Sequence, residues 1–167
     1  PELEEVMLQS LKAHWRLPGR TRLLIDISGS MEDKLSRQSE MTRMEAACGL
    51  AIMAREICAE VEIFVFSEIV DKVTPRRGFA LRDAIVGALP HESTYLGAAV
   101  RKVDQPGTRL IVFTDEQSHD QVPAPRGRGY MVNVASYQHG VGKGDWQRVD
   151  GFSEAVIGLI AAHEQMD

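Results

Sequence analysis

The sequence has little of what would place a protein in a membrane or on a nucleic acid. No apolar run approaches the roughly 20 residues of a membrane-spanning helix, and no signal peptide is visible. The net charge is −5 and aromatic residues make up 6% of the chain, so a strongly basic face and a base-stacking platform are both absent. We therefore expect no membrane contact, and weak or no RNA binding by this chain alone.

Cysteine is also scarce. Cys48 and Cys58 stand in a stretch that we interpret as one helix, where roughly 15 Å of axial rise would separate them. They could not form a disulfide with each other, and neither lies in a metal-ligand spacing. Two buried free thiols fit a reducing compartment, so the sequence predicts a cytoplasmic protein.

The length of 167 residues fits one domain with a sizeable core. Hydrophobic residues make up 44% of the chain and charged residues 26%, an ordinary balance for a globular domain. The chain begins at Pro1 rather than Met, so we expect it to be part of a longer protein. We assign residues 1–20 to an amino-terminal helix and linker from a preceding region, and residues 21–167 to the domain itself.

Helices and strands alternate along the chain. Helical periodicity and caps predict helices at 1–18, 42–59, 81–89, 94–103 and 152–165. Apolar or alternating runs predict strands at 21–27, 61–67, 69–73, 109–114, 130–135 and 146–149. This order predicts an α/β, Rossmann-like fold: a six-stranded, mainly parallel sheet with one antiparallel edge strand and helices on both faces.

Pro18-Gly19 separates the first predicted helix from the first strand, because neither residue continues a helix well. That helix either packs on the domain or belongs to the region before it. Farther along, Thr42-x-x-Glu45 is a capping box and predicts the start of the second helix.

Chemistry-bearing residues follow two of the buried strands. The segment Asp26-Ile27-Ser28-Gly29-Ser30 delivers one carboxylate and two hydroxyls to the loop after the first strand. Asp115 follows the strand at 109–114, and Thr94 opens a predicted helix after a turn-like segment. Ligands of such sheets bind at the carboxyl ends of the strands, where the strand order reverses. If the two strands are neighbours, these groups meet at one edge.

Five oxygen ligands would then converge. Hard oxygen ligands that leave room for water suit Mg²⁺ or Mn²⁺ better than zinc or copper. The sequence therefore predicts a metal site made of Asp26, Ser28, Ser30, Thr94 and Asp115.

The set resembles the metal-ion-dependent adhesion site of von Willebrand factor A domains. The family's D-x-S-x-S motif stands at residues 26–30, its separate threonine at Thr94 and its second aspartate at Asp115. The resemblance implies that the hydroxyls touch the cation directly while the aspartates act partly through water. Hydroxyls leave the ion electrophilic, so a partner protein could add a carboxylate.

A narrower resemblance appears in four segments, which look like the end of Ro/TROVE proteins: 114–117, 133–137, 140–146 and 148–154. That family joins a ring of helical repeats, which binds misfolded and Y RNAs, to a von Willebrand A domain. Only the second part is present here. The resemblance implies a non-enzymatic, Mg²⁺-binding interaction module of an RNA quality-control protein. Its partner would be a protein with an acidic residue, and RNA would bind only through the missing repeats.

Two other functions stay open. One is a stand-alone adhesion or chelatase-associated A domain without an RNA link, and the other is a metal-assisted hydrolase at the same edge. A Ser-His-Asp hydrolase lacks its Gly-x-Ser-x-Gly elbow here. A haloacid-type phosphatase would need a second aspartate where Ser28 stands.

Other features allow both a plain and a functional interpretation. His91 and His119 flank the predicted edge, where they either contact a ligand or are solvated loop residues. The glycines at 140, 142 and 144 with Lys143 hint at a phosphate loop. Because no Gly-Lys-Ser/Thr follows, we favour a connecting loop.

Overall fold

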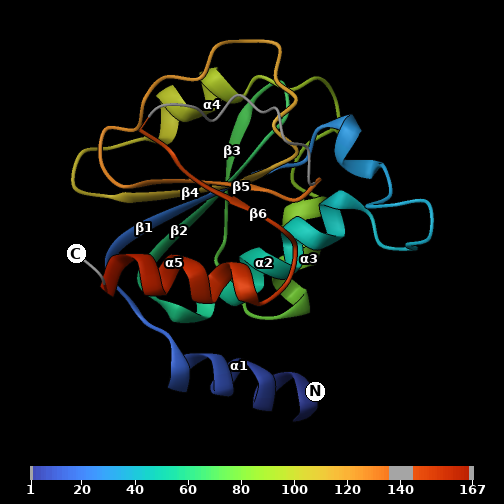
Figure 1. Cartoon of the computed structure of the whole chain (residues 1–167). Helices are drawn as coiled ribbons and strands as arrows, with labels where there is room; N and C mark the ends of the chain where they lie inside the picture. Colours follow the sequence, from blue (N-terminus) through green and yellow to red (C-terminus); the bar gives the residue numbers. More distant parts are fainter. Residues whose placement is uncertain (1, 136–144, 166–167) are drawn as a thin grey trace.

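One six-stranded sheet forms the centre of the molecule, with helices on both faces (Figure 1). The structure is a computed structural model that describes residues 2–135 and 145–165. The strands are β1 Leu17–Asp26, β2 Cys58–Phe66, β3 Val70–Val73, β4 Arg109–Thr114, β5 Gly129–Asn133 and β6 Gln147–Asp150. Their order is β3-β2-β1-β4-β5-β6, and β3 pairs antiparallel with β2 while all the other pairs are parallel. The predicted α/β fold is confirmed.

The helices divide between the two faces of this sheet (Figure 1). Their bounds are α1 Glu2–His14, α2 Arg43–Ile57, α3 Phe79–Val86, α4 Leu96–Val103 and α5 Ala155–Gln165, with a 3₁₀ turn, η1, at Gly29–Glu32. Side chains alternate across β1, so Leu23 and Ile25 join the core under α2 and α5, while Leu24 joins the core under α4. A strand covered on both faces must be apolar throughout, as β1 is.

The polar ends of β1 and β4 lie at the same edge because the two strands are parallel neighbours. Thr21 lies opposite Arg109 at their amino ends, and Ile25 lies opposite Phe113 near their carboxyl ends. The strand order reverses between these strands: β2 follows β1 on one side, and β4 and β5 continue on the other. This is the position where α/β sheets bind ligands.

Three differences from the predicted boundaries bear on the core and on the site. First, β1 begins at Leu17 rather than at residue 21, because its pairing with β2 shifts between Leu17 and Arg20 and this irregularity absorbs Pro18 and Gly19. Second, α2 ends at Ile57, so Cys58 starts β2 and is only half-buried, unlike the buried Cys48. Third, α4 begins at Leu96, so Thr94 lies in the loop before it. The capping box at Thr42 is confirmed.

The first helix packs on the domain. Leu8 and Leu11 are buried against the core, and the Glu4 carboxylate accepts a hydrogen bond from the Phe79 backbone N–H at the start of α3 (2.8 Å). The domain boundary at residue 20 itself stays a prediction.

Within residues 2–135 and 145–165, no helix combines the length and the apolar character needed to cross a membrane.

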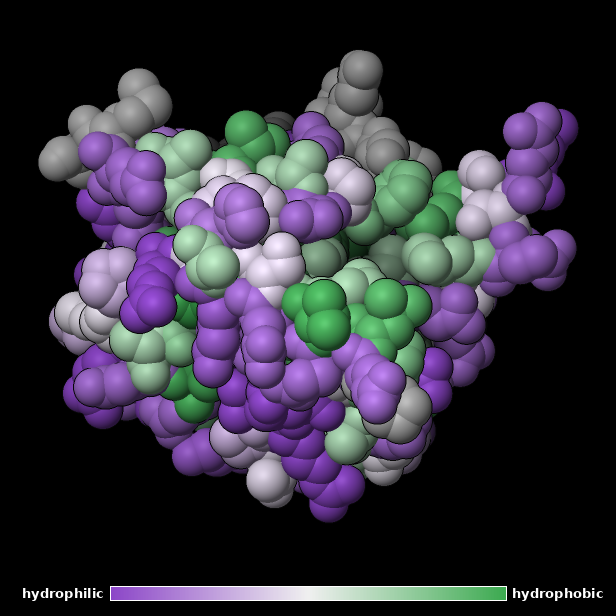
Figure 2. All heavy atoms as spheres, turned by 90° about the horizontal axis from the view of Figure 1, so that it is seen from below, coloured by the Kyte–Doolittle hydropathy of each residue, from purple (hydrophilic) through white to green (hydrophobic). Residues whose placement is uncertain are grey.

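The surface on the α1 side carries an apolar patch. Figure 2 shows hydrophobic side chains gathered there within a mostly hydrophilic face. Leu3, Met7 and Phe79 are each more than half exposed, and they line a groove of about 690 Å³ between α1, α2 and α3.

The glycine-rich segment at 140–144 lies outside the described residues, as do Ser136 and Tyr137.

Candidate metal centre

Asp26, the last residue of β1, is completely buried and held by three donors. The Ser28 backbone N–H and hydroxyl donate to its Oδ1 (2.9 and 2.6 Å), and the Thr114 hydroxyl donates to Oδ2 (2.7 Å). Burial, reinforced by the nearby charge of Asp115, raises the pKa of the Asp26 carboxyl to about 7, although these hydrogen bonds act in the opposite direction. The side chain is therefore fixed in place before any ligand arrives.

Asp115, directly after β4, is buried beside it. The Ser30 hydroxyl donates to its Oδ2 (2.7 Å), and the Gln117 backbone N–H donates to Oδ1 (3.1 Å). Arg43, the first residue of α2, also donates to Oδ2 from Nη1 (3.1 Å). Two loops and a helix start thus meet on one carboxylate.

The hydroxyls of Ser28 and Ser30 have a consistent orientation. Each donates its proton to a carboxylate, and the two oxygens lie 3.5 Å apart. A hydroxyl has one proton but two lone pairs, so a serine that donates to an aspartate keeps its oxygen available as an acceptor. This chemistry fits a hard cation such as Mg²⁺ or Mn²⁺.

Thr94 lies across a cavity of about 240 Å³ that also contacts Ser30 and His119. Its carbonyl accepts a hydrogen bond from the His119 backbone N–H (3.0 Å), while its hydroxyl has no hydrogen-bond partner within the described part of the chain. The structure therefore joins Asp26, Ser28, Ser30 and Asp115 in one network and places Thr94 on the adjoining cavity. Their role as metal ligands stays a prediction.

Hydroxyls make up three of the five predicted ligands at this edge. Among the described residues, no group of three or more His, Cys, Asp or Glu side chains could hold a metal ion. Any cation here would depend on neutral hydroxyls for much of its coordination, as the predicted ligand set requires.

The two flanking histidines differ in their contacts. His91 bonds to Glu32 Oε1 (2.7 Å) and to the Val86 carbonyl (3.0 Å), so it ties the loop before Thr94 to η1 and α3. His119 lies against the Tyr95 ring, with centroids 5.8 Å apart, and lines the cavity. Only His119 is therefore positioned to meet a ligand there.

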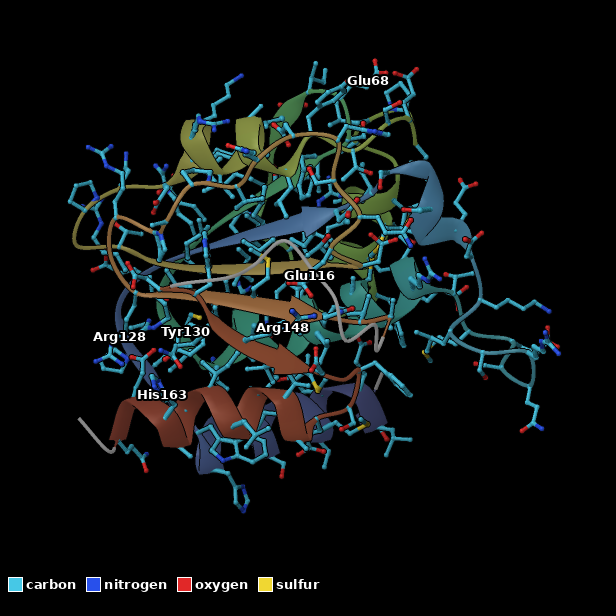
Figure 3. All side chains as sticks on the ribbon, turned by 45° about the horizontal axis from the view of Figure 1, so that its top comes forward. Glu68, Glu116, Arg128, Tyr130, Arg148 and His163 are labelled. Atoms are coloured by element: carbon cyan, nitrogen blue, oxygen red, sulfur yellow. The ribbon has the colours of Figure 1, made fainter. Side chains whose placement is uncertain are left out.

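A second buried cluster lies next to Asp115, and sequence reasoning did not assign it to the site. The Glu116 carboxylate pairs with Arg148 of β6 (2.5 Å; Figure 3). It also accepts a hydrogen bond from the Asn133 amide of β5 (2.9 Å). Glu116 has a φ of 58°, an uncommon value for a residue with a side chain. All three residues belong to the segments that carry the narrower resemblance, which was the available signal.

The comparisons with known proteins concern the fold. No family model and no curated protein matches the chain. The crystal structure of the Ro (RSR) protein of Deinococcus radiodurans is similar over 97% of this chain and 38% of that one, with a TM-score of 0.69 and 20% identity. The Bacteroides thetaiotaomicron protein BatB is similar over 89% of this chain and 98% of its own (TM-score 0.60, 17% identity). An aerotolerance-related membrane protein of Bacteroides fragilis is similar over 88% of both chains, with a TM-score of 0.54 and 16% identity.

These similarities confirm the predicted Rossmann-like α/β fold and the resemblance to Ro, and they are consistent with a von Willebrand A fold. The chain spans 38% of the length of the solved Ro chain. Because α1 alone has 13 of the 167 residues, a match over 97% of the chain must include most of it. The leading helix is thus part of the shared architecture.

Proposed function

We propose that this domain is a cation-dependent interaction module that captures an acidic side chain of a partner protein. Asp26, Ser28, Ser30, Thr94 and Asp115 would hold Mg²⁺ or Mn²⁺ at the edge of the sheet. The observation that carries the proposal is the orientation of Ser28 and Ser30, whose hydroxyls donate to the two aspartates and keep their lone pairs available.

The charges around the site favour an acidic partner. With a cation bound and both carboxyls ionised, Asp26 and Asp115 would bring two negative charges, and the Arg43 guanidinium offsets one of them. A bound divalent cation would give the centre a net positive charge, which a carboxylate from a partner would neutralise. The Thr94 hydroxyl and the cavity beside Ser30 offer the approach.

We propose a non-enzymatic role, because the two candidate acids are engaged in holding the loops. A metal-assisted hydrolase is the second candidate, and the observation that favours it is the His119 ring on the same cavity. His119→Ala separates the two: capture of an acidic peptide should survive this change, whereas hydrolysis that depends on a histidine base would be lost.

We also propose that the module belongs to a cytoplasmic Ro-like protein of RNA quality control, since the similarity to the solved Ro protein covers 97% of this chain. RNA would bind through the helical repeats of such a parent and not here. A gel shift with this chain at physiological salt should show no submicromolar RNA complex. Helical repeats encoded upstream would support this context, whereas an associated ATPase module would support the chelatase alternative.

Calorimetric titration with Mg²⁺ and Mn²⁺ tests the metal site. Asp26→Ala should abolish binding, while Asp83→Ala, an exposed change on α3, should leave it unchanged. If Asp26→Ala binds Mg²⁺ with the same affinity as the parent, the site is wrongly assigned.

Partner capture needs a separate experiment. Thr94→Ala should weaken the capture of partner proteins from a lysate, as EDTA does. The melting temperature should stay unchanged, because the variant loses one hydroxyl but little core volume. A set of captured proteins that neither EDTA nor Thr94→Ala alters would rule out the metal as the recognition element.

A further inference from the structure

Arg43 brings a positive charge into the candidate metal centre. Its side chain is buried at the start of α2, directly after the capping residue Thr42. Nη1 donates to Asp115 Oδ2 (3.1 Å) and to the Ser30 carbonyl (3.4 Å), and it lies 3.8 Å from Asp33 Oδ2. One guanidinium therefore contacts the second aspartate, the serine loop and the end of η1.

We infer that Arg43 is a resident counter-cation of this centre: it holds Asp115 and Ser30 in place when no metal is bound, and it competes with a divalent cation for Asp115. The inference rests on the proposed function, because competition requires a metal site. It names a residue that sets how tightly the site binds its cation.

The buried Asp115 carboxylate needs a counter-charge. Two carboxylates buried beside each other repel, and a buried charge without a partner is strongly unfavourable. Asp26 is stabilised by three donors without a formal charge, whereas Asp115 receives one charged donor, Arg43. A guanidinium keeps its charge at every relevant pH, so this support is permanent.

Arg43 and a divalent cation would compete for the Asp115 carboxylate. A divalent cation on Asp115 would meet the positive guanidinium at the same carboxylate, and like charges in a poorly screened site repel strongly. The Asp33 carboxylate gives Arg43 another partner, since it is 3.8 Å from Nη1 and its side chain is 68% exposed. A small movement of the guanidinium from Asp115 toward Asp33 would make room for the metal without leaving Arg43 unpaired.

The main chain of Arg43 is anchored on both sides of the residue. The Arg43 backbone N–H donates to the Asp33 carbonyl (2.9 Å), and the capping box fixes the residue before it. Because the main chain is held on both sides, only the side chain has to move. The start of α2 therefore stays in place in both states.

The test compares Arg43→Gln, which removes the charge but keeps a donor, with Arg43→Lys, which keeps the charge. Calorimetry should show that Arg43→Gln binds Mg²⁺ about tenfold more tightly than the parent, whereas Arg43→Lys stays within about threefold. In EDTA, Arg43→Gln should melt below the parent, and excess Mg²⁺ should remove most of that difference.

A second variant keeps the test decisive if Arg43→Gln folds poorly. Asp33→Asn removes the alternative partner of Arg43 at an exposed position, and it should weaken Mg²⁺ binding several-fold. Glu32→Gln is the matched control. It also removes a nearby negative charge, but Glu32 bonds to His91 and not to Arg43. Equal effects of both variants would reduce the result to a general loss of negative charge and overturn the inference.

The remaining outcomes separate the inference from the proposed function. If neither the parent nor Arg43→Gln binds Mg²⁺ or Mn²⁺, the metal site itself is wrong and the competition falls with it. If both bind with equal affinity, the metal site stands and the inference fails. A parent and an Arg43→Gln protein that melt together in EDTA would contradict the counter-cation role directly.

Discussion

The two ends of the strands β1 and β4 both carry buried polar clusters, and the clusters differ in their charge. At the amino ends, Arg109 pairs with Glu164 of α5 and donates to the Thr21 hydroxyl (2.6 Å). Tyr130 and His163 complete this cluster (Figure 3), with the Tyr130 hydroxyl 3.0 Å from Glu164. At the carboxyl ends, the buried Arg43 pairs with Asp115, while Asp26 accepts hydrogen bonds from uncharged donors of Ser28 and Thr114.

The amino-end cluster is closed, since Arg109 pairs with Glu164, the Thr21 and Tyr130 hydroxyls bond to this pair, and the Arg128 side chain bonds to Tyr130. The carboxyl-end cluster is open, because it keeps an excess of negative charge and hydroxyls with available lone pairs. A closed buried pair holds the fold together, whereas an excess of buried charge is unfavourable until a ligand neutralises it. This difference is what the proposed function requires: a structural cluster at the amino ends and a ligand site at the carboxyl ends.

Arg109→Met should give the largest effect. It leaves the largely buried Glu164 without its cation, and breaking a buried pair costs about 3–5 kcal/mol of unfolding free energy. Denaturant unfolding should show this loss equally with Mg²⁺ and with EDTA. The double variant Arg109→Met/Glu164→Gln should recover much of it, and an Mg²⁺-dependent loss would break the distinction between the two ends.

Glu116→Gln should lower the unfolding free energy by about 2 kcal/mol. The change removes the charge that Arg148 and Asn133 bond to, while the size of the side chain is kept. Since Glu116 follows Asp115, Mg²⁺ affinity should also fall. Urea unfolding and calorimetry together measure the two effects, and an unchanged stability would show that Arg148 finds other support.

A matched pair of threonine changes sharpens the comparison. Thr114→Val and Thr21→Val both remove a hydroxyl that bonds to a buried charged group, so each should cost about 1–2 kcal/mol. Only Thr114→Val should also weaken Mg²⁺ binding, because Thr114 supports Asp26. Equal calorimetric affinities for the two variants would contradict an open site at the carboxyl end.

The smallest effect concerns pH at the open end. Burial lowers the pKa of His91, but its hydrogen bonds to Glu32 and to the Val86 carbonyl, with the Glu32 charge, outweigh this and raise the pKa above 6.5. A raised pKa means that this stabilisation is full below about pH 6.5 and is lost as the pH rises through the folded-state value.

Glu32→Gln should therefore reduce the stability gained on going from pH 8 to pH 5.5. Because Glu32 is largely exposed and solvent screens the pair, the change should stay below about 1 kcal/mol. Chemical denaturation at both pH values measures it, with Glu40→Gln in the neighbouring exposed loop as the control. An identical pH dependence in the parent and in Glu32→Gln would leave His91 without a role in it.

Local patterns predicted most of the fold. The strand at 109–114 and the helix start at Thr42 appear as expected, because a fully buried strand and a capping box both have clear local signatures. The start of β1 was placed too late, since Pro18 and Gly19 are usually read as breaks and only the pairing with β2 accommodates them.

The candidate site divides in the same way. The order of Asp26, the serines, Thr94 and Asp115 along the chain was sufficient to group them, and four of the five lie in one hydrogen-bonded network. Thr114 was missed although it precedes Asp115, because its hydroxyl could not be assigned to Asp26 without the neighbouring strand. Arg148 gave no sign of its partner for the same reason.

The sequence by itself determined the alternation of helices and strands and the set of oxygen-bearing residues at the strand ends, because both follow from local periodicity and from motif order. Only the tertiary structure decided the charge of the site. Arg43 stands 72 positions from Asp115, and Glu116 stands 32 positions from Arg148. Contacts at such separations have no spacing rule, since they depend on which strands become neighbours and on which helix begins at their ends.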